Sequence, residues 1–76
     1  MSDNEIRLRL NNVLRDIDTG DLNIQKKLNT ELRNLVSMRF PGMDLMLPPI
    51  QATTVDCYQS NTKYIANRLY KALELS

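Results

Sequence analysis

Apolar residues recur at intervals of three and four in three separate stretches of this 76-residue chain, and this spacing constrains the fold more than any other feature. Side chains at these intervals lie on one face of an α-helix, because the helix turns every 3.6 residues. A chain of this length forms one domain. The sequence therefore predicts an all-α fold, a small bundle of three or four helices that occupies residues 1–76 as a single domain.

The first predicted helix begins behind a capping box formed by Ser2 and Glu5, with Asp3 placed in the first turn to complement the helix dipole. Its apolar stripe consists of Ile6, Leu10, Val13, Leu14 and Ile17. We expect Gly20 to end this helix, because glycine readily adopts the left-handed conformation that follows a last helical turn.

The second predicted helix follows at once, with Asp21 as its N-cap and Thr19 as the alternative. Its apolar stripe consists of Ile24, Leu28, Leu32, Leu35 and Val36. Phe40-Pro41-Gly42 ends it, because proline disfavours helix in the residue before it. Since the break between the two helices is short, they should form an antiparallel αα-hairpin.

The last predicted helix is the longest, and Thr53 and Asp56 offer a capping box at its start. Its apolar stripe consists of Val55, Tyr58, Thr62, Ile65, Leu69 and Ala72, widened by Ala66 and Leu73. A helix over residues 54–75 would contain about 22 residues and measure about 33 Å. It is long enough to pack along both helices of the hairpin.

Residues 41–53 form the least regular segment and hold all three prolines. The sequence allows two conformations here. A short helix after Pro49 would make the bundle four-helical, and the alternative is an extended connection. The segment is also rich in methionine and leucine, and such residues suit adaptable binding surfaces. Its apolar side chains therefore either close one end of the bundle or form a partner-binding surface. The partner-binding candidates are Phe40, Met43, Met46 and Leu47.

The absence of histidine and the presence of a single cysteine exclude several kinds of site. A structural zinc site needs four nitrogen or sulfur ligands, and a Ser–His–Asp triad or Cys–His pair needs histidine. We therefore expect no enzyme activity, cofactor or metal. Asp16, Asp18 and Asp21 are interpreted as caps and solvated helix ends. Cys57 is interpreted as a small buried apolar residue, with a reactive thiol as the alternative.

The lone Cys57 fits a reducing compartment, and no signal peptide opens the chain. No apolar run approaches the roughly 20 residues that a membrane-spanning helix requires. We therefore expect a soluble cytoplasmic protein with no membrane partner. The net charge of +1 gives no overall attraction to a polyanion, so any binding to nucleic acid would come from a local patch.

Such local patches exist, because cations exceed acids on two of the predicted helices. On the last helix Tyr64, Arg68 and Lys71 share one face, with Lys63 further round. This face offers phosphate contacts and an aromatic ring that can stack on a base, whereas the alternative is an ordinary solvated helix face. The nucleic-acid-binding candidates are Lys63, Tyr64, Arg68 and Lys71, with Lys26, Lys27 and Arg33 as a second patch.

The stretch from Lys63 to Leu73, KYIANRLYKAL, resembles the closing helix of the HRDC domain, with Tyr64 at the aromatic position of that family. HRDC domains are small helical nucleic-acid-binding modules of RecQ helicases and RNase D. The whole chain also resembles the small proteins that accompany the T-even phage helicase UvsW. This resemblance implies a non-enzymatic role beside a helicase in replication, recombination or repair, with DNA and a helicase as partners in the cytoplasm of the phage host.

Two further functions remain open from the residues themselves. The first alternative is a small protein-protein interaction or regulatory module that docks onto its partner through the segment Phe40–Ile50. Homodimerisation along the long last helix is a third option, and the sequence leaves the oligomeric state open.

Overall fold

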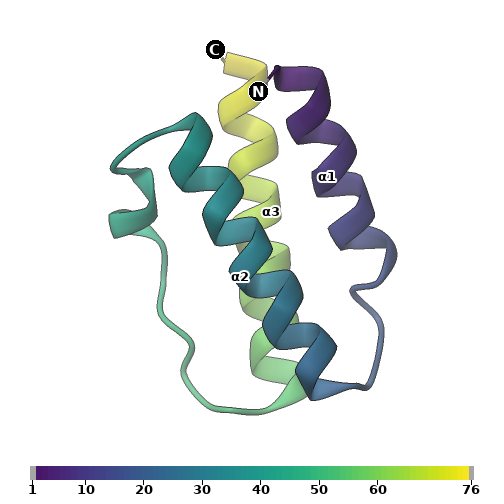
Figure 1. Cartoon of the computed structure of the whole chain (residues 1–76). Coiled ribbons are helices and arrows are strands. Elements are labelled where there is room, and N and C mark those ends of the chain that lie inside the picture. Colours follow the sequence, from purple (N-terminus) through teal and green to yellow (C-terminus); the bar gives the residue numbers. More distant parts are fainter. Residues whose placement is uncertain (1, 76) are drawn as a thin grey trace.

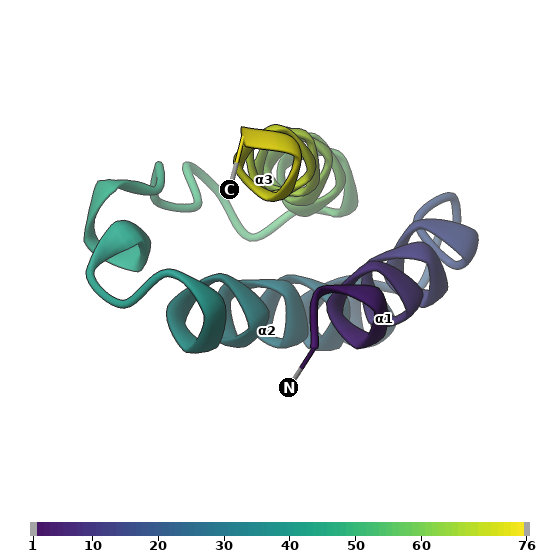
Figure 2. The same ribbon diagram turned by 90° about the horizontal axis from the view of Figure 1, so that it is seen from above.

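The computed structural model describes residues 2–75 and shows an all-α bundle. Its elements are α1 (Asp3–Arg15), α2 (Leu22–Arg39), the short 3₁₀ helix η1 (Met43–Met46) and α3 (Val55–Leu75). Helices α1 and α2 lie side by side in one layer, and α3 packs on that layer (Figures 1 and 2). The predicted fold class is confirmed in its three-helix form, because η1 is only a single turn. No helix within residues 2–75 has the length and apolar character needed to cross a bilayer.

Two of the predicted helix starts are confirmed by their side-chain caps. The hydroxyl of Ser2 accepts a hydrogen bond from the backbone amide of Glu5 at 3.2 Å, at the start of α1. Asp21 Oδ1 accepts from the amides of Asn23 and Ile24 at 2.9 and 3.3 Å, so Asp21 rather than Thr19 caps α2. Caps of this kind each stabilise a helix by about 1 kcal/mol, because they satisfy amides that have no partner within the helix.

One predicted helix end and one predicted cap are wrong. Helix α1 ends at Arg15 rather than at Gly20, and Gly20 does not adopt a left-handed conformation. The physical reason is the buried side chain of Gln25, whose Nε2 donates to the carbonyls of Ile17 at 2.6 Å and Thr19 at 3.0 Å and so holds a turn there. At the start of α3, the hydroxyl of Thr54 accepts from the amide of Cys57 at 3.2 Å, in place of the predicted capping box.

Helix α2 runs antiparallel to α1, as predicted, but parallel to α3 (Figure 1). The chain must therefore travel back along the 18-residue helix α2, a distance of about 27 Å. Residues 47–54, here called the return segment, contain no helix and can span about 26 Å at ~3.3 Å per residue. Pro48 and Pro49 suit this role, because proline fixes φ near the extended range. The segment thus runs along the side of the bundle instead of closing one end.

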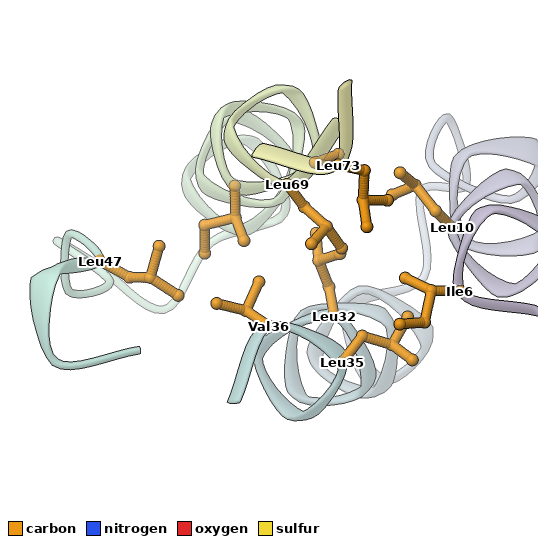
Figure 3. Packing of buried hydrophobic residues seen from close by; sticks show 10 residues of the cluster. Ile6, Leu10, Leu32, Leu35, Val36, Leu47, Leu69 and Leu73 are labelled. Carbon is orange, nitrogen blue, oxygen red and sulfur yellow. The ribbon is translucent and has the colours of Figure 1, made fainter. Parts of the chain in front are cut away.

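The apolar stripes of the three helices meet in one main core, which Leu47 joins from the return segment (Figure 3). Its buried members are Ile6, Leu10, Leu32, Leu35, Val36, Leu47, Ile65, Ala66, Leu69 and Leu73. A smaller cluster of Val13, Ile17 and Leu28 packs near the α1–α2 connection. The predicted stripes therefore supply the core. Ile24 is the clear exception, because it is 39% exposed while its neighbour Gln25 is fully buried.

A network of polar side chains joins α2, α3 and the return segment. Arg33 donates from Nε to Asn29 Oδ1 at 2.9 Å, and from Nη2 to the carbonyl of Pro48 at 2.6 Å and to Asn61 Oδ1 at 2.9 Å. Asn29 Nδ2 donates to Asn61 Oδ1 and to the hydroxyl of Thr62, both at 2.9 Å. Asn61 Nδ2 donates to the Pro48 carbonyl at 3.0 Å. We call Asn29, Arg33, Asn61, Thr62 and the Pro48 carbonyl the polar network.

The polar network generates a stability prediction at Asn61. Replacing Asn61 by Ala removes the oxygen that accepts from Asn29 and Arg33, and leaves part-buried donors unsatisfied. We expect a loss of about 1–3 kcal/mol in the free energy of unfolding, measured by urea denaturation. Asn67→Ala is the matched control, because Asn67 is an exposed asparagine on the same helix and gains the same helix propensity. Equal stabilities of the two variants would contradict the role of the network.

Candidate functional site

The outward face of α3 carries the first set of predicted nucleic-acid-binding residues. Tyr64, Arg68 and Lys71 are exposed, whereas Ile65 and Leu69 turn into the core. The Tyr64 side chain is 49% exposed, so its ring is accessible to a ligand. Among residues 2–75, no ion pair engages Arg68 or Lys71. Their charges are therefore available to an external anion.

Lys63 lies on the neighbouring side of α3, and an acid lies within ion-pair distance of it. Its Nζ is 3.9 Å from Asp18 Oδ1, and both side chains are exposed. Asp18 Oδ1 also accepts a hydrogen bond from Gln59 Nε2 at 3.1 Å, which holds the carboxylate beside α3. An exposed pair at this distance contributes little to stability, so a phosphate can compete for the lysine.

Lys63 also lines a groove of about 350 Å³ between α1 and α3. The other lining residues are Leu14, Ala66, Asn67 and Tyr70. Sequence reasoning did not select Asn67 and Tyr70 as site residues. Their spacing could have identified them. Residues 63, 67 and 70 stand at i, i+4 and i+7, so they share one face of the helix. Leu14 has no such signal, since it comes from α1.

The second predicted patch lies on the opposite side of the bundle. Lys26 and Lys27 line a shallow groove of about 670 Å³ on the outer surface of α2, together with Arg9 and Glu31. Lys27 is on the side of α2 opposite Leu32, which faces the core and α3. The structure therefore does not bring the two cationic surfaces together. Arg9 belongs to the second one but escaped sequence reasoning, because it is contributed by α1.

Arg33 was predicted to belong to this second patch, yet its guanidinium is taken up by the polar network. Arg39, which adds to the local charge of the same helix, is also in structural use. Its Nε donates to Asp3 Oδ1 at 2.6 Å, and its guanidinium lies 4.5 Å from the centre of the Phe40 ring. The hydrogen bond to Asp3 raises the pKa of Arg39 above its usual value. Two of the four cations of α2 are thus used to join elements of the fold.

The four predicted partner-binding residues lie in different environments. Leu47 is buried in the main core, and Phe40 and Met43 pack against that core. Met46 is 74% exposed and is joined by Leu45, which is 85% exposed. The fold therefore uses most of the apolar excess of this segment internally, and leaves an exposed apolar pair on η1.

Within residues 2–75, the cysteine and the acidic side chains do not come together in one site. Cys57 is a half-buried free thiol in the first turn of α3. Asp21 caps α2, and the described part of the chain contains no group of three or more His, Cys, Asp or Glu residues placed to hold a metal ion.

No protein-family model, curated protein or solved structure matches this chain. The resemblance to HRDC domains therefore stays a prediction. The function proposed below depends on the chemistry of the α3 surface.

The different environments of Leu47 and Met46 generate a prediction. Leu47→Ala removes a buried side chain from the main core, so we expect a loss of about 2 kcal/mol or more in the free energy of unfolding. Met46→Ala truncates the exposed side chain of the preceding residue, at the end of η1, and should change stability by less than about 0.5 kcal/mol. Urea denaturation of both variants provides the comparison. A neutral Leu47→Ala variant would show that the return segment does not pack on the core.

Proposed function

We propose that this protein is a non-catalytic accessory module that binds nucleic acid through the outward face of α3. The observation that supports this most directly is the exposure of Arg68 and Lys71 beside Tyr64, with neither cation paired to an acid within residues 2–75. Arginine and lysine contact phosphates, and an exposed tyrosine ring stacks on a base of any identity. The face therefore combines the two chemical elements of single-strand binding.

The position of the acids supports the same face. On α3, Asp56 lies in the first turn and Glu74 in the last, so the central turns that carry Tyr64, Arg68 and Lys71 contain no carboxylate. The net charge of +1 is thus a sum of separated charges and not a uniform distribution. A polyanion that follows Tyr64, Arg68 and Lys71 meets no carboxylate from these turns, although Asp18 lies beside the neighbouring Lys63. The cations of α3 would attract nucleic acid locally and weakly. Weak binding of this kind fits an accessory module that acts together with another nucleic-acid-binding protein.

The resemblance of residues 63–73 to the closing helix of HRDC domains points to the same helix. By that resemblance, we propose a helicase as the partner and replication, recombination or repair as the setting. The protein itself would bind nucleic acid and would catalyse no reaction.

A charge-reversal pair tests the proposed face. In the double variant Arg68→Glu, Lys71→Glu, two phosphate contacts become repulsive, so we expect affinity for labelled single-stranded and forked DNA to fall at least 10-fold. Fluorescence anisotropy at several salt concentrations measures this. Each lost contact should also reduce the slope of log K against log salt by about 0.7 for a single strand. Absence of wild-type binding even at low salt would remove the proposal.

The matched control for that experiment is the double variant Arg9→Glu, Lys27→Glu. It changes the net charge by the same amount, but in the groove that Arg9 of α1 shares with Lys27 of α2, away from the proposed face of α3. We expect less than a twofold loss of affinity. Equal losses in the two double variants would show that net charge, and not the α3 face, governs binding.

The Asp18–Lys63 pair generates a second prediction for the same activity. Asp18→Asn removes the carboxylate 3.9 Å from Lys63 Nζ while retaining an oxygen that accepts from Gln59. We expect affinity for single-stranded DNA to rise two- to threefold at low salt, and the gain to shrink as salt screens the charges. Glu31→Gln is the control, since it removes one acid from the opposite surface. An equal gain from both variants would contradict a local effect at Lys63.

A second candidate function is a protein-docking module, favoured by the exposure of Leu45 and Met46 on η1. The double variant Leu45→Asp, Met46→Asp should then lose the partner in a pull-down while its helicity by circular dichroism is unchanged. Leu8→Asp is the control, because Leu8 is a 61% exposed leucine on another element. Retention of the partner by the η1 variant would exclude this surface.

A further inference from the structure

We infer that the groove between α1 and α3 is a subsite for one unpaired base of a single-stranded nucleic acid. This inference rests on the proposed function and adds to it the kind of strand that is bound. The groove has a volume of about 350 Å³ and is lined by Leu14, Lys63, Ala66, Asn67 and Tyr70. The groove is open to solvent and small, so it suits one base laid against it and not a longer segment.

The floor and one side of the groove offer apolar and aromatic surface. Ala66 is only 3% exposed and belongs to the main core, and Leu14 packs against that core from α1. Tyr70 is 38% exposed, so part of its ring is open to the groove. A base that enters would cover the apolar side chains and stack against the tyrosine, a contact that single-strand-binding proteins commonly use.

The rim of the groove offers polar groups that match a base and its phosphate. The exposed amide of Asn67 makes no hydrogen bond to another side chain or to the backbone within residues 2–75, so its donor and acceptor are both available. Such an amide can pair with the hydrogen-bonding edge of a base. The ammonium of Lys63 stands at the same rim and is held by Asp18 only at 3.9 Å.

The groove and the proposed phosphate-binding face lie on neighbouring sides of the same helix. Residues 63, 67 and 70 form one strip along α3, and residues 64, 68 and 71 form a second strip with the same spacing, about 100° further around the helix. A strand that follows α3 would place phosphates on Arg68 and Lys71 and turn a base toward Tyr70. Asp18 lies beyond the groove and repels phosphate, but not an uncharged base, so the charges favour this orientation.

The arrangement implies selectivity between strand types. Bases within a duplex are paired and stacked, so none is available to enter the groove, whereas phosphates are available in both forms. The groove should therefore raise affinity for single strands and leave duplex binding to Arg68 and Lys71 alone.

Equilibrium titration with a ten-nucleotide oligothymidine and with a blunt duplex tests the subsite. Tyr70→Ala should weaken oligothymidine binding about 10-fold, through loss of stacking, and leave duplex binding unchanged. Tyr70→Phe keeps the ring and should bind like wild type, and Asn67→Ala should lose affinity for the single strand without loss of stability. Leu8→Ala, which truncates an exposed side chain outside the groove, is the control and should bind both ligands normally.

Methyl chemical shifts of the wild-type protein provide a readout that needs no variant. Oligothymidine should shift the methyl signals of Leu14 and Ala66, which line the groove from two different helices, and the duplex should not. The subsite is overturned if Tyr70→Ala and Asn67→Ala bind oligothymidine normally and the methyl signals of Leu14 and Ala66 do not shift. The proposed function still stands in that case if the double variant Arg68→Glu, Lys71→Glu weakens binding. If the wild type binds neither ligand, both are overturned.

Discussion

The hydrogen bonds of Arg33 hold together the part of the fold that the helices alone would leave open. Helices α2 and α3 run parallel, so the chain must return along the bundle before α3 can begin (Figure 1). Arg33 donates to the Pro48 carbonyl on that return segment and to Asn61 on α3. Its acceptors within residues 2–75 are side-chain amide and backbone carbonyl oxygens rather than carboxylates. A part-buried charge needs such acceptors, because removal from water is otherwise costly.

This structural use of cations decides which charges reach the surface. Arg33 and Arg39 both lie on α2, and both are engaged, one with the polar network and the other with Asp3. The remaining cations of α2 face away from α3 and share a groove with Glu31. Apart from the weak contact of Lys63 with Asp18, the cations of α3 form no ion pair or side-chain hydrogen bond with residues 2–75. The face of α3 is therefore the surface on which uncompensated charge and aromatic rings coincide.

One side of helix α3 is buried in the core, and the other side is exposed to solvent. Ile65 and Leu69 are fully buried and anchor the helix to the core. Figure 3 shows Leu69 pointing from α3 into that core. Side chains on the outward strips are thus placed by a packed 21-residue helix and not by a loop, which fixes their spacing relative to one another. The groove beside Tyr70 exists only because α1 brings Leu14 against the same helix.

The sequence by itself determined the fold class, the three helices with their core stripes, the caps at Ser2 and Asp21 and the outward face of α3. These features depend on interactions within four residues along the chain. Only the tertiary structure decided that Gln25 is buried while Ile24 is exposed, that Arg33 is structural, that Leu47 joins the core and that Leu14 completes a groove. The decisive contacts join residues far apart, such as Arg33 with Asn61 and Asn29 with Thr62, 28 and 33 positions away. Local periodicity carries no information about which distant side chains will meet, because packing of whole helices sets those distances.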